Sequence, residues 1–351
     1  MPVQKKYIPL LLGVAVAFGI FLGATLNFTT VSDTLFSSNS KKEKLNRLID
    51  FIDFEYVDKV NTDSIVDITV NSILENLDPH SVYIPSKSYE DVASDMRGNF
   101  IGIGISFYQH QDSIAVIRTI EGGPAQKAGI QAGDRILYAD TIPLFGKGLN
   151  RYDVVSQLKG TRNSKVSLKI KRKNQDSLLS ITVTRQKIPL VSLDAAYLLT
   201  DAIGYIKLNR FAEPTYSEFK KALTALIDKG ATKLVLDLRD NPGGYISSAQ
   251  DIVDEFLQDN TLILITKNKN GKQEKTYATN KGSFKTGSLY VLINENSASA
   301  SEIVAGALQD NDKGVIIGRR SFGKGLVQRE MALGDGSAVR LTIARYYTPT
   351  G

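Results

Sequence analysis

The first hydrophobic pattern in the chain is an unbroken apolar run. Residues 8–26 carry no charge, are rich in Leu, Ile, Val, Ala and Gly, and follow Lys5 and Lys6. A run of this length can cross a bilayer core, and preceding lysines favour a cytoplasmic N-terminus. A cleaved signal peptide is the alternative, but its apolar region is usually shorter, about 7–15 residues. We therefore predict a membrane anchor that places the rest of the chain in the periplasm or another extracytoplasmic space.

A helical spacing follows a short polar segment. Residues 29–40 are small and polar, which predicts a tether, and between residues 41 and 77 apolar positions recur at steps of three and four. This spacing predicts two amphipathic helices that pack together. They should end at the Asp-Pro pair of residues 78–79, because proline disfavours helix at the residue before it. Residues 88–96 predict a shorter helix.

Strand-like apolar runs bounded by glycines begin near residue 98. Residues 101–105 lead into a predicted strand, and further strands are predicted at residues 114–120, 165–172 and 178–185. A helix is predicted at residues 152–159 and a short helix after the glycines at 122–123. This order resembles a PDZ domain. The amides of Ile103, Gly104 and Ile105 would then bind the terminal carboxylate of a peptide, and an exposed strand edge would take the peptide as an added strand. Alternatively, these glycines only permit a sharp entry into the strand.

The last part of the chain alternates strands with helices. Apolar runs of strand length occur at residues 203–208, 234–238, 261–266, 289–293 and 315–317, and helices are predicted at residues 217–229, 245–257 and 300–310. Such alternation predicts an α/β core with a mostly parallel sheet whose working surface lies at the strand ends. We expect an α/β multidomain protein: an anchor or signal segment at 1–28, a tether and helices at 29–96, a PDZ domain at 97–186 and the core at 187–351.

Composition removes several classes of function. The 351 residues include no Cys and only two His, which excludes a cysteine hydrolase and argues against a protein metal site. His80 lies in a turn-like segment and His110 in a polar hairpin tip, so neither is favoured as the base of a Ser-His-Asp triad. The net charge of +6 comes from lysines spread along the chain, without the basic, aromatic-interleaved stripe of a nucleic-acid binder.

A serine cluster and a lone lysine are the candidate chemistry. Residues 297–302 read Ser-Ala-Ser-Ala-Ser-Glu at a predicted helix start, and Lys324 lies in Phe-Gly-Lys-Gly-Leu-Val-Gln. A neutral lysine can act as base for a serine nucleophile if its surroundings lower its pKa. Gln328 falls on the same predicted strand face as Lys324 and would orient the amine. The spacing alone does not choose among the three serines, any of which could cap the helix.

Two glycine-rich segments suggest sites for anions. The Asn-Pro-Gly-Gly turn ending in Gly243 and Gly244 leaves a predicted strand and enters a helix, so its amides could hold a developing oxyanion, or the turn could be a plain connection. Residues 318–325 nearly match a phosphate-binding loop. Gly325, however, occupies the position of the required hydroxyl, which argues against nucleotide binding.

Five motifs together resemble the carboxyl-terminal processing, or tail-specific, proteases. They lie in that family's order at residues 77–83, 236–244, 297–303, 322–328 and 346–351, with the PDZ-like block between the first two. The resemblance implies that Ser299 is the nucleophile, Lys324 the general base and Gln328 its orienting partner. It also implies an oxyanion hole made of the amide of Ala300 and that of Gly243 or Gly244.

The same resemblance predicts what the protein does. It implies a membrane-tethered serine endopeptidase, without a cofactor, that cleaves exported proteins near or from C-termini held by the PDZ domain, and it allows for a homo-oligomer. Family sequences usually continue past the segment that ends at Gly351, so we expect the core to be truncated there. The alternative is a catalytically silent, membrane-tethered PDZ adaptor that binds peptide C-termini.

Overall fold

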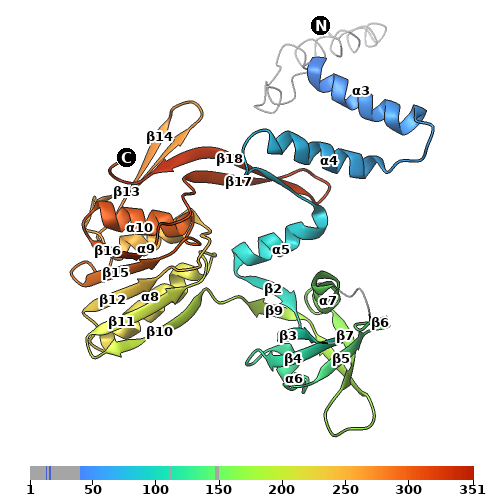
Figure 1. The fold of residues 1–351 in the computed structure, drawn as a ribbon, viewed down its shortest axis with the longest axis horizontal. Helices are drawn as coiled ribbons and strands as arrows, with labels where there is room; N and C mark the ends of the chain where they lie inside the picture. The colour runs from blue at the N-terminus through green and yellow to red at the C-terminus, as the bar shows by residue number, and fades with distance from the viewer. Residues whose placement is uncertain (1–12, 14–15, 17–39, 111–112, 147–149) are drawn as a thin grey trace, which may run out of the picture. The chain divides into compact units, whose positions relative to one another are not determined.

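A computed structural model describes residues 13, 16, 40–110, 113–146 and 150–351 (Figure 1). The chain divides into two compact units, residues 1–72 and residues 73–351. The predicted anchor at residues 8–26 lies outside the described residues, apart from positions 13 and 16. Within the part that is described, no helix is both long and apolar enough to span a bilayer.

Two helices follow residue 40, as their spacing predicts. They are α3 (Ser40–Glu55) and α4 (Thr62–Glu75). The Thr62 hydroxyl donates to Asp53 Oδ1 at 2.6 Å and thereby joins the start of α4 to the end of α3. A third helix, α5 (Ser86–Arg97), ends in a left-handed cap at Gly98.

The PDZ-like region is a six-stranded antiparallel sheet with two short helices. Its strands follow the order β3-β4-β5-β7-β8, and β6 pairs with β5. The elements are β3 (Ile105–His110), β4 (Ser113–Thr119), α6 (Pro124–Lys127), β5 (Arg135–Ala139), β6 (Ile142–Pro143), α7 (Arg151–Leu158), β7 (Lys165–Lys171) and β8 (Leu179–Thr184). The chain enters and leaves this region through the paired strands β2 (Asn99–Gly102) and β9 (Gln186–Pro189).

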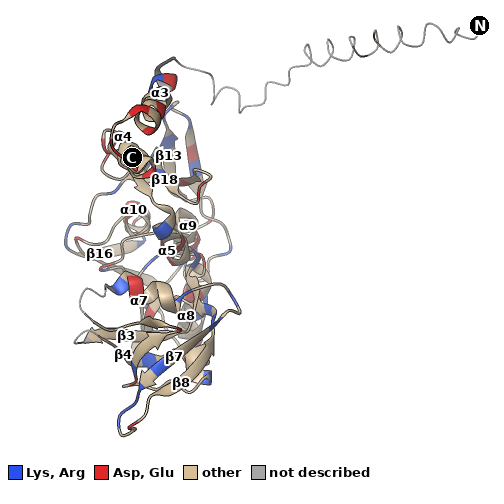
Figure 2. Ribbon diagram, turned by 90° about the vertical axis from the view of Figure 1, so that its right-hand side faces the viewer, with Lys and Arg blue, Asp and Glu red and all other residues tan. Residues whose placement is uncertain are grey.

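Strand β7 shows how sequence alternation becomes a buried face. Val166, Leu168 and Ile170 have no exposed surface, whereas Lys165 and Lys169 face solvent. The lysines at this point in the sequence therefore lie on the solvent-facing side of a strand. Figure 2 shows Lys and Arg distributed over several elements and interspersed with Asp and Glu.

The core contains the predicted parallel sheet. Its order is β10-β11-β12-β15-β16, and only β10 runs antiparallel to its neighbour. The strands are β10 (Leu193–Thr200), β11 (Ile203–Leu208), β12 (Lys233–Asp237), β15 (Ser288–Ile293) and β16 (Gly314–Gly318), and the helices are α8 (Thr215–Asp228), α9 (Ile246–Asp254) and α10 (Ala300–Asp310). The α/β fold class is thus confirmed.

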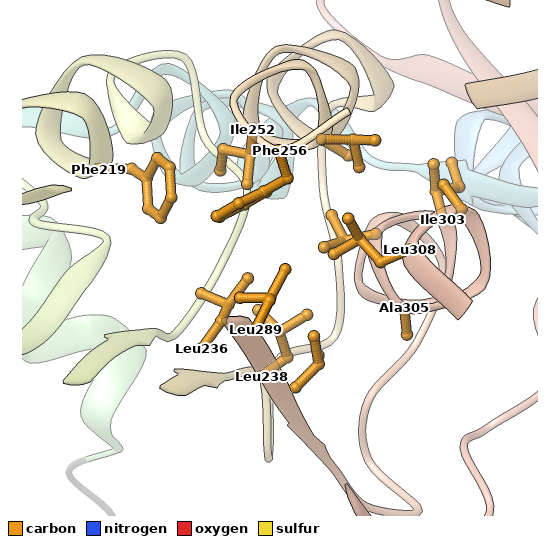
Figure 3. Packing of buried hydrophobic residues seen from close by; sticks show 14 of the residues in the cluster. Phe219, Leu236, Leu238, Ile252, Phe256, Leu289, Ile303, Ala305 and Leu308 are labelled. Atoms are coloured by element: carbon orange, nitrogen blue, oxygen red, sulfur yellow. The ribbon is translucent and has the colours of Figure 1, made fainter. Parts of the chain in front are cut away.

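Helices and sheet share one apolar core. Figure 3 shows Phe219 of α8, Phe256 just beyond α9 and Leu308 of α10 gathered over Leu236 and Leu289 of the central strands. All but Leu289, which is 2% exposed, have no exposed surface. Removing that much apolar area from water holds the ends of β12 and β15 rigidly in place.

The strand predicted at residues 261–266 is not part of the parallel sheet. As β13 (Leu262–Asn268) it belongs to a second, antiparallel sheet with β1 (Val82–Ile84), β14 (Gln273–Tyr277), β17 (Leu326–Ala332) and β18 (Ala338–Tyr347). The prediction was wrong because β13 pairs antiparallel with β14 on one edge and with β18 on the other, which leaves no free edge for a parallel partner. Strand β1 pairs with β18 and brings the turn before it, residues 78–81, to the edge of this sheet.

Candidate active site

Ser299 occupies a strained backbone position immediately before α10. Its φ of 54° and ψ of −111° are rare for a residue with a Cβ, and such outliers concentrate at functional sites. The backbone N–H of Ser299 donates to Glu302 Oε2 at 2.8 Å, which ties the strained residue to the first turn of the helix.

The serines on either side have structural partners. The buried hydroxyl of Ser297 donates to the Leu238 carbonyl at 2.7 Å, and that of Ser301 donates to the Asn241 carbonyl at 2.9 Å. Both bonds fasten the serine turn to the chain that leaves β12. Among the three serines, Ser299 is the one that lines a cavity.

The Asn-Pro-Gly-Gly turn lies against Ser299. A Cβ on Gly243 would stand 2.6 Å from the Ala298 carbonyl oxygen and 2.9 Å from both Ser299 Cβ and the Ala300 nitrogen, so only glycine permits this approach. Gly243 also has a φ of 99°, which side chains disfavour. Its N–H donates to Asn241 Oδ1 at 2.9 Å. Among the described residues, no acceptor pairs with the amides of Gly244 and Ala300.

Lys324 lies in the loop before β17 and not within the strand as predicted. The strand begins at Leu326, and its pairing with β18 shifts register between Val327 and Gln328. Even so, Lys324 Nζ donates to Gln328 Oε1 at 2.7 Å, so the predicted contact between the two side chains is present. Burial lowers the pKa of the Lys324 amine, and the positive charge of Arg340 lowers it further.

Gln328 is itself held by a turn far away in the sequence. Its Nε2 donates to the backbone carbonyl of His80. Asp78 shapes that turn, because Oδ1 accepts the N–H groups of His80 at 2.8 Å and Ser81 at 2.9 Å. Burial acts to raise the pKa of Asp78, but hydrogen bonds from Ser81 and His80 hold it below its usual value. His80 thus supports Gln328 through its backbone carbonyl and is held by Asp78 through its backbone N–H.

One cavity of about 640 Å³ collects most of the predicted site. Ser299, Lys324, Gln328, Gly243 and Gly244 all line it. Its remaining walls are Met96, Pro242, Tyr245, Ile246, Ser247, Leu326, Arg329, Glu330 and Arg340.

The predicted carboxylate-binding residues lie elsewhere. Ile103 and Gly104 are buried at the entry to β3, where their carbonyls accept the N–H groups of Ala125 and Ile120, each at 2.9 Å. Neither they nor Ile105 line the cavity at Ser299. A peptide site at residues 103–105 remains a prediction.

Several contributors to the site went unnoticed in the sequence. Glu302 had a signal, because Ser-x-x-Glu at a helix start is the pattern of a capping box. Asp78 and Tyr346 lie in two of the motifs that support the family resemblance, but their residue types and spacing predict no role for either side chain. The Tyr346 hydroxyl contacts the carbonyl oxygens of Ser299 and Lys324. In the described part of the chain, no cluster of His, Asp or Glu side chains is arranged to hold a metal ion.

Comparison with known families matches residues 102–183 to the PDZ domain and residues 202–351 to Peptidase family S41. The carboxy-terminal-processing protease of Bartonella bacilliformis is 36% identical over 340 residues, which cover 95% of this chain and 77% of that protein. The carboxy-terminal processing protease CtpB of Bacillus subtilis is 33% identical over 312 residues, covering 88% of this chain and 64% of CtpB. Among solved structures, a photosystem II D1 C-terminal processing protease shares 28% identity with a TM-score of 0.50, covering 90% of each chain.

Proposed function

This chain belongs to peptidase family S41, among the carboxy-terminal processing proteases that carry a PDZ domain, and on that basis we propose that it is a serine endopeptidase with a Ser299–Lys324 dyad. The observation that supports the proposal is the shared cavity, which is lined both by Ser299 and by Lys324, whose amine is held by Gln328. Burial of that amine supports a base that is neutral when it works.

The proposed reaction uses the lysine twice. Neutral Lys324 Nζ accepts the proton of Ser299 Oγ as that oxygen attacks a peptide carbonyl, and the ammonium then returns the proton to the leaving amine. Water hydrolyses the resulting ester with Lys324 again as base. Gln328 accepts a hydrogen bond from the Lys324 amine and thereby orients the amine so that the nitrogen lone pair points at Ser299.

The oxyanion is assigned to the amides of Gly244 and Ala300. The Gly243 N–H already donates to Asn241, which favours Gly244 of the two glycines. Ala300 is the first residue of α10, and the positive end of a helix stabilises a negative oxygen. Both amides belong to turns fixed by buried contacts, so they need not reorganise when charge develops.

Substrates are proposed to be proteins or peptides with exposed C-termini. The PDZ domain supports this assignment, because such domains add a peptide as an extra strand and bind its carboxylate through backbone amides, here those of Ile103, Gly104 and Ile105. The apolar run at residues 8–26 supports an extracytoplasmic, membrane-tethered protease. The dyad chemistry itself requires no cofactor.

Cleavage of an unstructured protein with an apolar C-terminus tests the proposal. The purified chain and its Ser299→Ala variant are compared at equal concentration, with matching melting curves to show that both fold. We expect Ser299→Ala to lose about 10⁶-fold in kcat, the scale measured for removal of a catalytic serine. Equal cleavage by the two proteins, or cleavage by neither with the peptide tail still bound, would favour a PDZ adaptor.

A further inference from the structure

We propose that Glu302 and Tyr346 act as positioning residues that together set the separation of Ser299 and Lys324. We call this pair the dyad clamp. The inference rests on the proposed dyad and adds two residues to it. Neither side chain lines the cavity at Ser299, so the clamp acts on the reacting groups only through the backbone that carries them.

Glu302 joins the two dyad residues through one atom. Its Oε2 accepts the backbone N–H of Ser299 at 2.8 Å and the backbone N–H of Lys324 at 2.8 Å. Its Oε1 accepts the Ser321 hydroxyl at 2.7 Å and the Gly323 N–H at 2.6 Å. The carboxylate thus satisfies four donors, three of them from the lysine loop, and bonds to a charged acceptor are stronger than neutral ones.

Tyr346 makes the matching contact on the carbonyl side. Its hydroxyl lies 3.1 Å from the Ser299 carbonyl oxygen and also bonds the Lys324 carbonyl oxygen. The side chain is 8% exposed. Burial raises the pKa of Tyr346, and the negative charge of Glu302 raises it further, so the phenol keeps the proton that it donates. The Tyr346 N–H also donates to the Gly325 carbonyl at 3.0 Å.

The lysine loop depends on these contacts because it has no regular structure of its own. Residues 319–325 lie outside any helix or strand. A second cavity of about 370 Å³ borders Gly323, Lys324 and Gly325 as well as both clamp residues. The loop therefore has room to relax once the clamp is removed. A shift of about 1 Å at a reacting group costs on the order of 100-fold in rate.

Two conservative variants test the clamp. Glu302→Gln keeps the size of the side chain but leaves one acceptor oxygen for four donors, and we expect kcat to fall about 100-fold. Tyr346→Phe removes only the hydroxyl, and we expect about a 10-fold fall because Glu302 still joins the loop to the helix. KM should stay within about twofold in both variants, because the substrate-binding walls of the cavity are untouched.

Matched controls separate positioning from general loss of structure. Glu295→Gln removes a carboxylate that pairs with exposed Arg319, and Tyr347→Phe removes the neighbouring hydroxyl on β18; both should keep wild-type kcat. The double variant Glu302→Gln/Tyr346→Phe should lose about as much as Glu302→Gln alone, because both contacts act on one separation. All assays run well below each variant's melting temperature, and Tyr346→Phe alone decides if Glu302→Gln does not fold.

The outcomes distinguish the clamp from the dyad. Wild-type kcat in the folded clamp variants, or a loss confined to KM, would overturn the clamp while inactive Ser299→Ala and Lys324→Met proteins keep the dyad. Activity retained by Ser299→Ala would instead overturn the dyad. Lower kcat with unchanged KM in both clamp variants supports the proposal.

Discussion

The two halves of the proposed dyad are held by different kinds of structure. Ser299 lies between β15 and the buried helix α10. The flanking serines donate hydrogen bonds to backbone carbonyls of the segment that follows β12, the strand beside β15. Lys324 sits in an irregular loop that depends on Gln328, Glu302 and Tyr346. The proposed nucleophile is therefore held by buried contacts of the core in addition to Glu302 and Tyr346, whereas the proposed base depends mainly on a few polar side chains. We expect the serine side to be sensitive to backbone changes and the lysine side to single polar substitutions.

After Ser299→Ala, the largest expected effect comes from removing the amine of Lys324. Lys324→Met keeps the length of the side chain but removes the proposed base. We expect kcat to fall about 10⁴-fold with little change in melting temperature. Lys313 is the matched comparison, because burial lowers its pKa too, while its Nζ donates to the Lys285 and Gly287 carbonyls at 2.6 and 2.7 Å. Lys313→Met should lower the melting temperature and leave kcat of the folded protein unchanged. Comparable kcat losses in both variants would contradict the assignment of Lys324.

The next effect tests the serine side. Gly243→Ala places a Cβ 2.6 Å from the Ala298 carbonyl oxygen, so the turn must move away from Ser299. We expect kcat to fall about 100-fold, the scale of one lost oxyanion donor, together with a lower melting temperature. Gly334→Ala is the control: its φ of 102° imposes a similar backbone penalty, but a Cβ there has open space. Equal kcat values for the two alanine variants would show that the close contact with Ser299 is not needed.

The smallest expected effect tests which charges near Lys324 set the pKa of its amine. Activity should rise with pH as Lys324 loses its proton, with a midpoint below the ordinary lysine value because burial and Arg340 lower that pKa. Arg340→Gln removes a positive charge that lowers the pKa of Lys324, so this pKa should rise. The rising limb of kcat/KM should therefore move to higher pH by a fraction of a unit to about one unit. Arg345→Gln, on the exposed side of β18, should leave the limb in place.

Much of this arrangement was predictable because it follows from short-range patterns. The parallel strands and their helices were visible as apolar runs of the right length, and the helix start at Ser299 was visible as a cluster of small residues. Strand β13 was misplaced because periodicity gives a strand's faces but not its partner. Lys324 was placed on β17 because alternation could not show that the glycines on either side of it keep the chain irregular.

Tyr346 and the turn at Asp78 were beyond local reasoning for another reason. Their roles depend on the pairing of β18 with both β1 and β17, which brings together residues that are far apart in the sequence. A tyrosine on a strand carries no sign of which carbonyls its hydroxyl will meet. Glu302 was readable in principle, since its spacing from Ser299 fits a cap, but its bonds to the lysine loop were not.

The bond from Gln328 to the His80 carbonyl joins positions 248 apart in the chain. A ribosome must therefore synthesise the chain as far as Gln328 before the amine of Lys324 can be supported, and contacts between such distant segments form slowly. A growing chain therefore carries the proposed nucleophile, Ser299, before the proposed base is supported. Support for the proposed base therefore comes last in the order of synthesis, because the turn at Asp78 emerges first and the glutamine that it holds emerges 248 positions after His80.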